Sequence, residues 1–192
     1  MRPSTRSTER MSLPNKISIF RILLAPAIVA SLVYYHPDRD WLRFLALGLF
    51  TIGIASDAID GFLARVHRQQ TELGTLLDPI ADKSLILSTL ISCSVIHGLP
   101  AWMRIPAWFN LLVISRDVLL VAGTLVLFAM KGQWSVKPSW IGKSTTVAQM
   151  LVIPVVMLGG PPTVTQPLLI AAAALTVLSA ISYVRTGFRV LG

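Results

Sequence analysis

The sequence predicts an all-α membrane protein in which six transmembrane helices follow a basic N-terminal arm. Of its 192 residues, 54% are hydrophobic and only 14% are charged, whereas a soluble domain carries about a quarter charged residues. The mean hydropathy is +0.68, and the basic residues gather at the ends of the apolar segments. Composition and pattern therefore indicate membrane helices joined by short polar connections.

The predicted arm comes first, over residues 1–15, and a single six-helix domain follows over residues 16–192. The arm is polar and basic, and the apolar segment behind it continues for about a full bilayer width, beyond the length of a signal peptide. We therefore expect a retained cytoplasmic arm. The predicted transmembrane helices span residues 16–35, 41–66, 76–98, 105–130, 141–160 and 163–186.

Helix-breaking residues separate these segments. The sequences are HPD at 36–38, HGLP at 97–100, KGQW at 131–134 and GGPP at 159–162. The connections are too short to hold a second soluble domain. No repeat or low-complexity tract interrupts the pattern.

The distribution of Lys and Arg predicts the orientation of the helices. One side would hold ten basic residues, and the other side would hold Arg39, Arg43 and Arg104. Both termini are therefore expected in the cytoplasm, in agreement with an even number of crossings. The ten residues are Arg2, Arg6, Arg10, Lys16, Arg65, Arg68, Lys131, Lys137, Arg185 and Arg189.

The net charge of +8 comes from 17 basic and 9 acidic residues. Because the basic residues lie at segment ends, we expect membrane lipids and phosphorylated substrates as partners and no nucleic acid. Cys93 is the only cysteine, so no disulfide can form within the chain.

Four aspartates fall within the short stretch DAIDGFLARVHRQQTELGTLLDPIAD. Asp57 and Asp60 are spaced i and i+3, and Asp78 and Asp82 are spaced i and i+4, so each pair shares one helix face. A carboxylate inside a bilayer is costly, so such a cluster indicates function. Two divalent cations would balance the four charges, and ligands made only of hard oxygens favour Mg²⁺ or Mn²⁺ over Zn²⁺.

The stretch resembles the motif D-x2-D-G-x2-A-R-x8-G-x3-D-x3-D of the CDP-alcohol phosphotransferase family, and six helices with a basic arm also match that family. The resemblance implies that Asp57, Asp60 and Asp78 bind two metal ions, and that Asp82 lies close to the metals and acts as general base. It also implies a CDP-binding set. That set is Asp57, Asp60, Gly61, Ala64, Arg65 and Gly74.

The implied reaction transfers a phosphatidyl group from CDP-diacylglycerol to an acceptor alcohol, releasing CMP during phospholipid biosynthesis. We expect a bacterial inner membrane as the location, with the active site facing the cytoplasm; an organelle inner membrane would give the same sequence pattern. The family resemblance also makes a homodimer one expectation, for which Gly48 and Gly53 are candidate interface positions.

The first helix and the segments around Lys143 and Arg185 resemble those of phosphatidylglycerophosphate synthases and eukaryotic-type cardiolipin synthases. Glycerol 3-phosphate is the first expected acceptor and phosphatidylglycerol the alternative, with inositol, serine or ethanolamine-type acceptors ranked behind them. Two departures keep the alternative open: Thr145 replaces a usual second Lys, and Asp117 follows Arg116 where the glycerophosphate enzymes usually have Glu. The candidate residues for binding the acceptor or its phosphate are Asn15, Arg21, Lys83, Arg116, Lys143 and Arg185.

Three other interpretations remain open, of which the first is a noncatalytic relative that only binds lipid. Arg116 and Asp117 could form an ion pair that only fixes helix packing. The aspartate cluster could instead belong to a cation transporter, although a fixed Arg65 facing the site would oppose cation passage.

Overall fold

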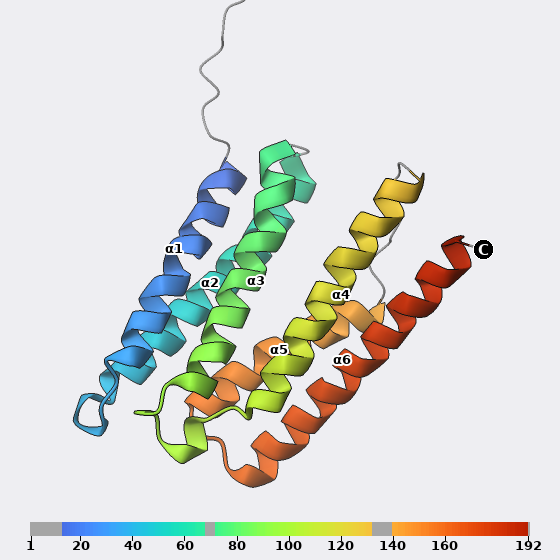
Figure 1. The fold of residues 1–192 in the computed structure, drawn as a ribbon. Helices are drawn as coiled ribbons and strands as arrows, with labels where there is room; N and C mark the ends of the chain where they lie inside the picture. Colours follow the sequence, from blue (N-terminus) through green and yellow to red (C-terminus); the bar gives the residue numbers. More distant parts are fainter. Residues whose placement is uncertain (1–12, 68–71, 132–139, 192) are drawn as a thin grey trace, which may run out of the picture. The chain divides into compact units, whose positions relative to one another are not determined.

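Six α-helices and two short 3-10 turns make up the part of the chain that the structure describes, which confirms the predicted all-α class (Figure 1). The structure is a computed structural model, and it describes the backbone of residues 13–67, 72–131 and 140–191. Side chains are described for residues 17–57, 81, 83–126, 129 and 140–187. The elements are α1 (Leu13–Val33), η1 (Pro37–Arg39), α2 (Trp41–His67), α3 (Glu72–Val95), η2 (Ala101–Met103), α4 (Ala107–Lys131), α5 (Trp140–Met157) and α6 (Pro162–Leu191).

The chain forms two units, Met1–Thr89 and Leu90–Gly192, and the division falls within α3. In the first unit, α1 packs against α2. In the second unit, α4 and α5 each pack against α6. A buried hydrogen bond of 3.1 Å from Gln149 Nε2 to Thr176 Oγ1 joins α5 to α6. Helix pairs of this kind are expected where connections are short.

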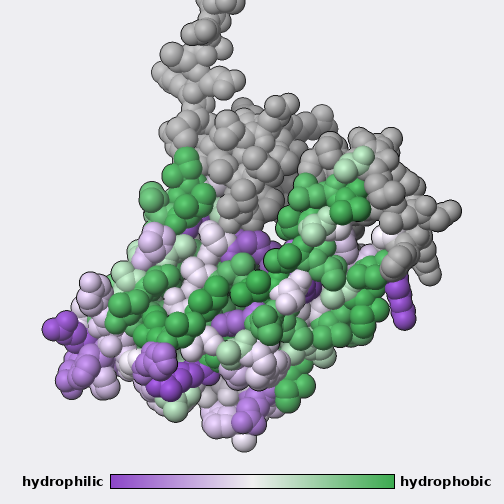
Figure 2. All heavy atoms as spheres, viewed as in Figure 1, coloured by the Kyte–Doolittle hydropathy of each residue, from purple (hydrophilic) through white to green (hydrophobic). Residues whose placement is uncertain are grey.

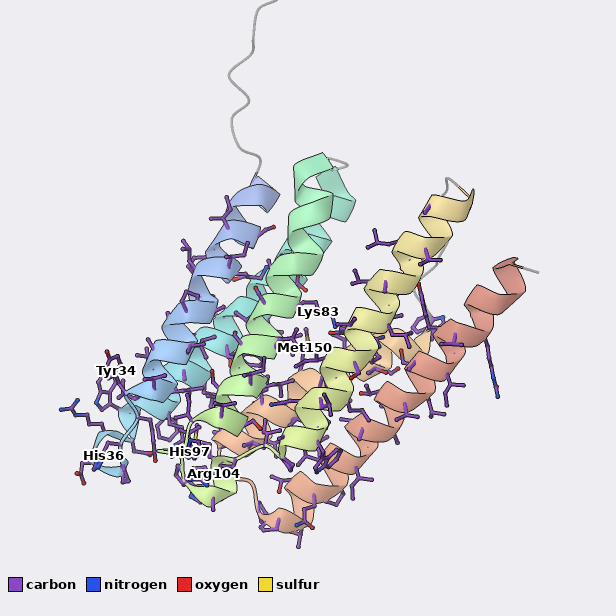
Figure 3. All side chains as sticks on the ribbon, in the orientation of Figure 1. Tyr34, His36, Lys83, His97, Arg104 and Met150 are labelled. Atoms are coloured by element: carbon purple, nitrogen blue, oxygen red, sulfur yellow. The ribbon has the colours of Figure 1, made fainter. Side chains whose placement is uncertain are left out.

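The turn between α1 and α2 forms at the predicted HPD breaker, where Figure 3 labels Tyr34 and His36. The His36 carbonyl accepts a hydrogen bond of 2.7 Å from the Arg39 backbone N–H. At the start of α2, the Asp40 carboxylate pairs with Arg43 Nη2 at 2.6 Å. These local contacts fix the reversal that brings α2 back along α1.

The end of α5 departs from the prediction, because the helix stops at Met157 rather than at residue 160. Gly159 has a φ of 74°, a left-handed conformation that a residue with a side chain adopts at a cost. Its N–H donates to the Val156 carbonyl at 3.1 Å, and the Gly160 N–H donates to Val155 at 2.9 Å. This pair of bonds is a Schellman motif, which terminates the helix.

Large hydrophobic side chains are exposed along the described helices, as an integral membrane protein requires. Leu23, Leu111 and Ile170 are each more than 60% exposed, and Figure 2 shows hydrophobic residues in green over much of the visible surface. Among the described residues, three stretches are long and apolar enough to cross a membrane, and two helices are apolar but shorter. The long stretches are Ala101–Val126, Trp140–Met157 and Pro162–Gly187. A total of six crossings therefore stays a prediction.

Candidate active site

Three helices of the first unit approach one another closely at Gly53 on α2. A Cβ atom placed on this glycine would lie 2.9 Å from Leu85 Cδ2 of α3 and 3.4 Å from Leu24 Cδ1 of α1. Ordinary contacts between carbon atoms are longer than the first distance, so glycine permits this approach. Gly53 therefore marks the level at which α1, α2 and α3 pack together.

One helical turn further along α2, Asp57 forms an ion pair with Arg21 of α1. Arg21 Nη1 donates to Asp57 Oδ1, across 36 positions of sequence. The Arg21 side chain is only 1% exposed, whereas the Asp57 side chain is 41% exposed. The guanidinium is thus enclosed by protein, while part of the Asp57 carboxylate stays accessible.

Helical geometry relates the other aspartate positions to the Gly53 contact. At about 100° per residue, positions 57 and 60 fall within about 40° of Gly53 around α2, and positions 78 and 82 fall within about 60° of Leu85 around α3. Only residues 68–71 connect the two helices, which makes them antiparallel neighbours. Along the chain, both pairs of positions therefore lie between the Gly53 contact and the connection formed by residues 68–71.

The axial rise gives the same result along the helices. At about 1.5 Å per residue, position 57 lies about 6 Å beyond Gly53, and position 82 lies about 4.5 Å beyond Leu85. Positions 60 and 78 each lie about 10 Å beyond the contact. Positions 57 and 82 therefore lie at similar levels along the two helices, and so do positions 60 and 78. The side chains of Asp60, Asp78 and Asp82 lie outside the described residues, so their convergence stays a prediction.

The remaining nucleotide-site candidates occupy helical backbone at the same end of these two helices. Gly61, Ala64 and Arg65 lie in the last two turns of α2, and Gly74 lies in the first turn of α3. Their side chains, and that of Asn15 in the first turn of α1, lie outside the described residues. Lys83 follows the fourth aspartate on α3 and is half-buried; Figure 3 labels it.

The donor chemistry of this stretch suits a divalent cation. The accessible part of the Asp57 carboxylate provides a hard oxygen ligand, and the neighbouring candidate positions provide only further carboxylates. Among the described side chains, no three His, Cys, Asp or Glu residues come together. Because Asp57 is the only one of the four aspartates in that set, this result leaves the proposed ligand group untested.

In the second unit, Arg116 joins α4 to α6. Its Nε and Nη2 atoms donate to Ser179 Oγ at 3.2 and 2.7 Å, and its Nη1 donates to Asp117 Oδ1 at 2.8 Å. The Arg116 side chain is buried at 7% exposure, and the Asp117 side chain is partly buried at 12% exposure. The ion pair between Arg116 and Asp117 that the sequence suggested is therefore present. Arg116 also bonds Ser179, a residue that the sequence analysis did not identify.

Two other candidate cations of the second unit are exposed. Lys143 lies in the first turn of α5, with its Nζ 5.2 Å from the centre of the Trp140 ring, and Arg185 lies near the end of α6. Thr145, by contrast, is fully buried. Its Oγ1 lies 2.8 Å from the Ile141 carbonyl and 3.0 Å from the Leu175 carbonyl, so its hydroxyl takes part in packing α5 against α6.

The structure shows the burial of Arg21 as part of one face of α1. On α1, the buried positions recur at alternating intervals of three and four residues, which is the spacing of one helix face. Arg21 belongs to that series and therefore faces protein. The series is Ser18, Arg21, Ala25, Ile28 and Leu32.

Comparison with known proteins adds independent information about the chain. Residues 11–178 match the sequence profile described as CDP-alcohol phosphatidyltransferase. This range contains all eight residues of the spaced aspartate motif.

Three bacterial proteins illustrate the similarity. A Cereibacter sphaeroides protein named CDP-diacylglycerol--glycerol-3-phosphate 3-phosphatidyltransferase is 33% identical over 148 residues, which cover 77% of this chain and 64% of that protein. The chain thus spans less than two thirds of that relative's length. A probable phosphatidylglycerophosphate synthase of Mycobacterium tuberculosis is 32% identical over 184 residues, covering 94% and 84%. An Escherichia coli protein with the same name as the first is 34% identical over 144 residues, covering 75% of each chain.

Proposed function

The chain belongs to the CDP-alcohol phosphatidyltransferase family, and we propose that it transfers a phosphatidyl group from CDP-diacylglycerol to glycerol 3-phosphate, releasing CMP. The observation that carries this proposal is the match of residues 11–178, which includes the complete aspartate motif. The acceptor is drawn from the relatives, whose names specify glycerol 3-phosphate or its phosphatidyl product.

Members of this family generally depend on divalent metal ions. We propose that Asp57, Asp60 and Asp78 hold two ions, Mg²⁺ or Mn²⁺, with Asp82 beside them. Bound there, the ions would supply positive charge to the diphosphate of CDP-diacylglycerol. The four carboxylates would supply the oxygen ligands that such ions prefer.

The proposed role of Asp82 is that of general base. Its carboxylate accepts the proton of the acceptor hydroxyl, whose oxygen forms a bond to the phosphorus that carries diacylglycerol. The bond from that phosphorus to the CMP oxygen breaks, and CMP leaves. Gly61, Ala64 and Arg65 line the CDP pocket in this proposal, so the nucleotide is positioned from the end of α2.

For the phosphate of the acceptor, exposed Lys143 and Arg185 are the best supported cations of the second unit. Arg116 donates to Asp117 and Ser179, so part of its charge and hydrogen-bonding capacity is already matched. Position 145 provides no second lysine, since Thr145 is buried between helices. This difference from the glycerophosphate enzymes is the reason to assay phosphatidylglycerol as an alternative acceptor.

We further propose a multi-pass arrangement in a bacterial inner membrane, with the active site on the cytoplasmic side. The excess of basic residues on one set of connections supports this orientation. A homodimer is also proposed from family membership. Of the two glycines considered for its interface, Gly53 packs within the chain, whereas a Cβ on Gly48 would meet nothing within 4 Å.

Acceptor-dependent CMP release tests the proposed reaction. Detergent-purified protein with Mg²⁺ and CDP-diacylglycerol receives glycerol 3-phosphate or phosphatidylglycerol in separate reactions. We expect release with glycerol 3-phosphate and a fall of at least about 100-fold in Asp82→Asn, because a positioned general base contributes that much. Release with phosphatidylglycerol alone would instead identify a cardiolipin synthase.

The same preparation separates the enzyme from a cation transporter. A phosphatidyltransferase is expected to bind CMP more tightly when Mg²⁺ or Mn²⁺ is present, because metal and nucleotide share the aspartate site. If calorimetry detects no metal-dependent CMP binding in folded protein, the enzyme assignment fails.

A further inference from the structure

The environment of Arg21 indicates a role different from the acceptor contact that the sequence resemblance suggested. Its side chain is 1% exposed and lies on the buried face of α1. Its guanidinium donates to Oδ1 of Asp57, the first aspartate of the motif. A group enclosed in this way and already bonded to a carboxylate is poorly placed to receive a soluble phosphorylated alcohol.

Charge balance ties the two residues together. A cation buried in a membrane-embedded helix pair requires a nearby anion, because desolvation strongly penalises an uncompensated charge. Asp57 meets this requirement through one oxygen, while 41% of its side chain stays exposed. The carboxylate can therefore bond Arg21 on one side and still offer a ligand atom on the other.

The adjoining packing fixes where the pair sits. Leu24 of α1 lies against Gly53 of α2, and Arg21 and Asp57 lie one turn away on the same two helices. The two contacts form successive levels of one antiparallel helix interface. Sliding of α1 along α2 would break the ion pair between Arg21 and Asp57 and would also disturb the contact of Leu24 with Gly53.

We propose that Arg21 is a positioning residue for the metal site: it holds one oxygen of the Asp57 carboxylate and leaves the other to a divalent cation. The inference rests on the proposed function, because it takes Asp57 as a metal ligand. Carboxylates that bind metals are commonly oriented by a second hydrogen bond, and loss of such a partner weakens metal binding by about 10- to 100-fold. Lysine is an incomplete replacement for Arg21, because its ammonium is a compact point charge without the planar donor group of arginine.

Manganese binding to detergent-purified protein, followed by electron paramagnetic resonance, tests this role without relying on turnover. We expect Arg21→Gln to bind Mn²⁺ about 10- to 100-fold more weakly than the wild type. Arg21→Lys should fall between them, since it keeps the charge but loses the planar donor group.

Arg43→Gln is the matched control. Arg43 is also a largely buried arginine, paired with Asp40 at 13% and 42% exposure, and it lies about 21 Å along α2 from Asp57. The Mn²⁺ affinity of the Arg43→Gln protein is expected to stay within about twofold of wild type. An equal loss in Arg43→Gln and Arg21→Gln would reduce the effect to general loosening of the helices and overturn the proposal.

Steady-state kinetics separate positioning from acceptor binding. If Arg21 positions Asp57, Arg21→Lys lowers kcat and raises the Mg²⁺ concentration required, while KM for glycerol 3-phosphate changes little. If Arg21 instead contacts the acceptor, KM for glycerol 3-phosphate rises and Mn²⁺ affinity matches the wild type. That second result would overturn the proposal and restore the role expected from the sequence.

Thermal unfolding in metal-free detergent covers the case in which a variant folds poorly. Asp57→Asn removes an anionic partner of the buried Arg21 guanidinium, so the double variant Arg21→Met/Asp57→Asn is expected to unfold at a higher temperature than Asp57→Asn alone. Equal Tm values would show that the pair does not form and would overturn the proposal.

Failure of the proposed function has a different result. If Mn²⁺ binding depends on Arg21 but the wild-type protein releases no CMP, the proposed reaction is wrong and the positioning role of Arg21 stands. If the wild-type protein releases CMP but Arg21→Gln binds Mn²⁺ as tightly as the wild type, the proposed reaction stands and the positioning role of Arg21 is wrong.

Discussion

At the level of single residues, two nearly fully buried arginines each pair with an aspartate. Arg21 reaches across 36 positions to Asp57, whereas Arg116 pairs with its neighbour Asp117 and also bonds Ser179. A pair between adjacent residues could be considered from the sequence alone, and it was. The partner of Arg21 could not be read from local spacing, because it depends on how α1 packs against α2.

Ser179→Ala should destabilise the second unit. The serine hydroxyl accepts two guanidinium N–H groups from Arg116, and its loss leaves those donors buried without that acceptor. We expect a cost of about 1–3 kcal/mol, seen as a lower Tm in detergent. Ser144→Ala is the control, because Ser144 is exposed and bonds only the Trp140 carbonyl among the described contacts. Equal Tm values for the two variants would contradict this account of Arg116.

At the level of helices, Gly53 permits the close packing that precedes the candidate site. Gly53→Leu would place a large side chain where even a Cβ comes within 2.9 Å of Leu85. We expect about 1–3 kcal/mol of destabilisation from overpacking and a loss of metal-dependent CMP binding as α1 and α3 move. Differential scanning fluorimetry and calorimetry measure the two effects.

Gly48→Leu provides the matched comparison on the same helix. A Cβ at this position would meet nothing within 4 Å, so the substitution is expected to leave Tm and CMP binding near wild type. If Gly48→Leu proves as harmful as Gly53→Leu, the space around these glycines does not explain their effects. A harmful Gly48→Leu together with loss of dimers would instead support Gly48 as an interface position.

Helix positions were predictable because apolar runs and breakers are local signals. Each predicted segment coincides with a helix, while the end of α5 depended on Gly159 adopting a positive φ. The sharing of a face by Asp57 and Asp60 likewise follows from spacing. The meeting of α2 with α3 at Gly53 required tertiary structure, and convergence of all four aspartates stays a prediction.

At the level of the whole molecule, composition determined the fold class. With 54% hydrophobic residues, the chain has too much apolar surface for the described helices to bury, and many large side chains remain exposed. The number of crossings is less directly determined, since three stretches of the described residues meet the length and hydropathy of a span. The number of crossings is therefore tested by determining on which side of the membrane each connection lies.

Cysteine labelling measures the proposed orientation. Cys93 is buried and would first be replaced by alanine. Asp38→Cys, in the exposed turn after α1, is expected to react with a membrane-impermeant maleimide added outside spheroplasts, whereas Ser7→Cys should react only after lysis. Labelling of Ser7→Cys from outside would reverse the orientation inferred from the basic residues.

Identification of the lipid product is the decisive test of the proposed synthesis of phosphatidylglycerophosphate. Purified protein would be incubated with CDP-diacylglycerol, Mg²⁺ and isotopically labelled glycerol 3-phosphate, and the lipid extract would be analysed by mass spectrometry. We expect labelled phosphatidylglycerophosphate, formed in equal amount with CMP and absent without Mg²⁺ or in Asp82→Asn. If folded, metal-loaded protein forms no labelled lipid, or if Asp82→Asn forms as much as the wild type, the proposed reaction or the proposed role of Asp82 is wrong.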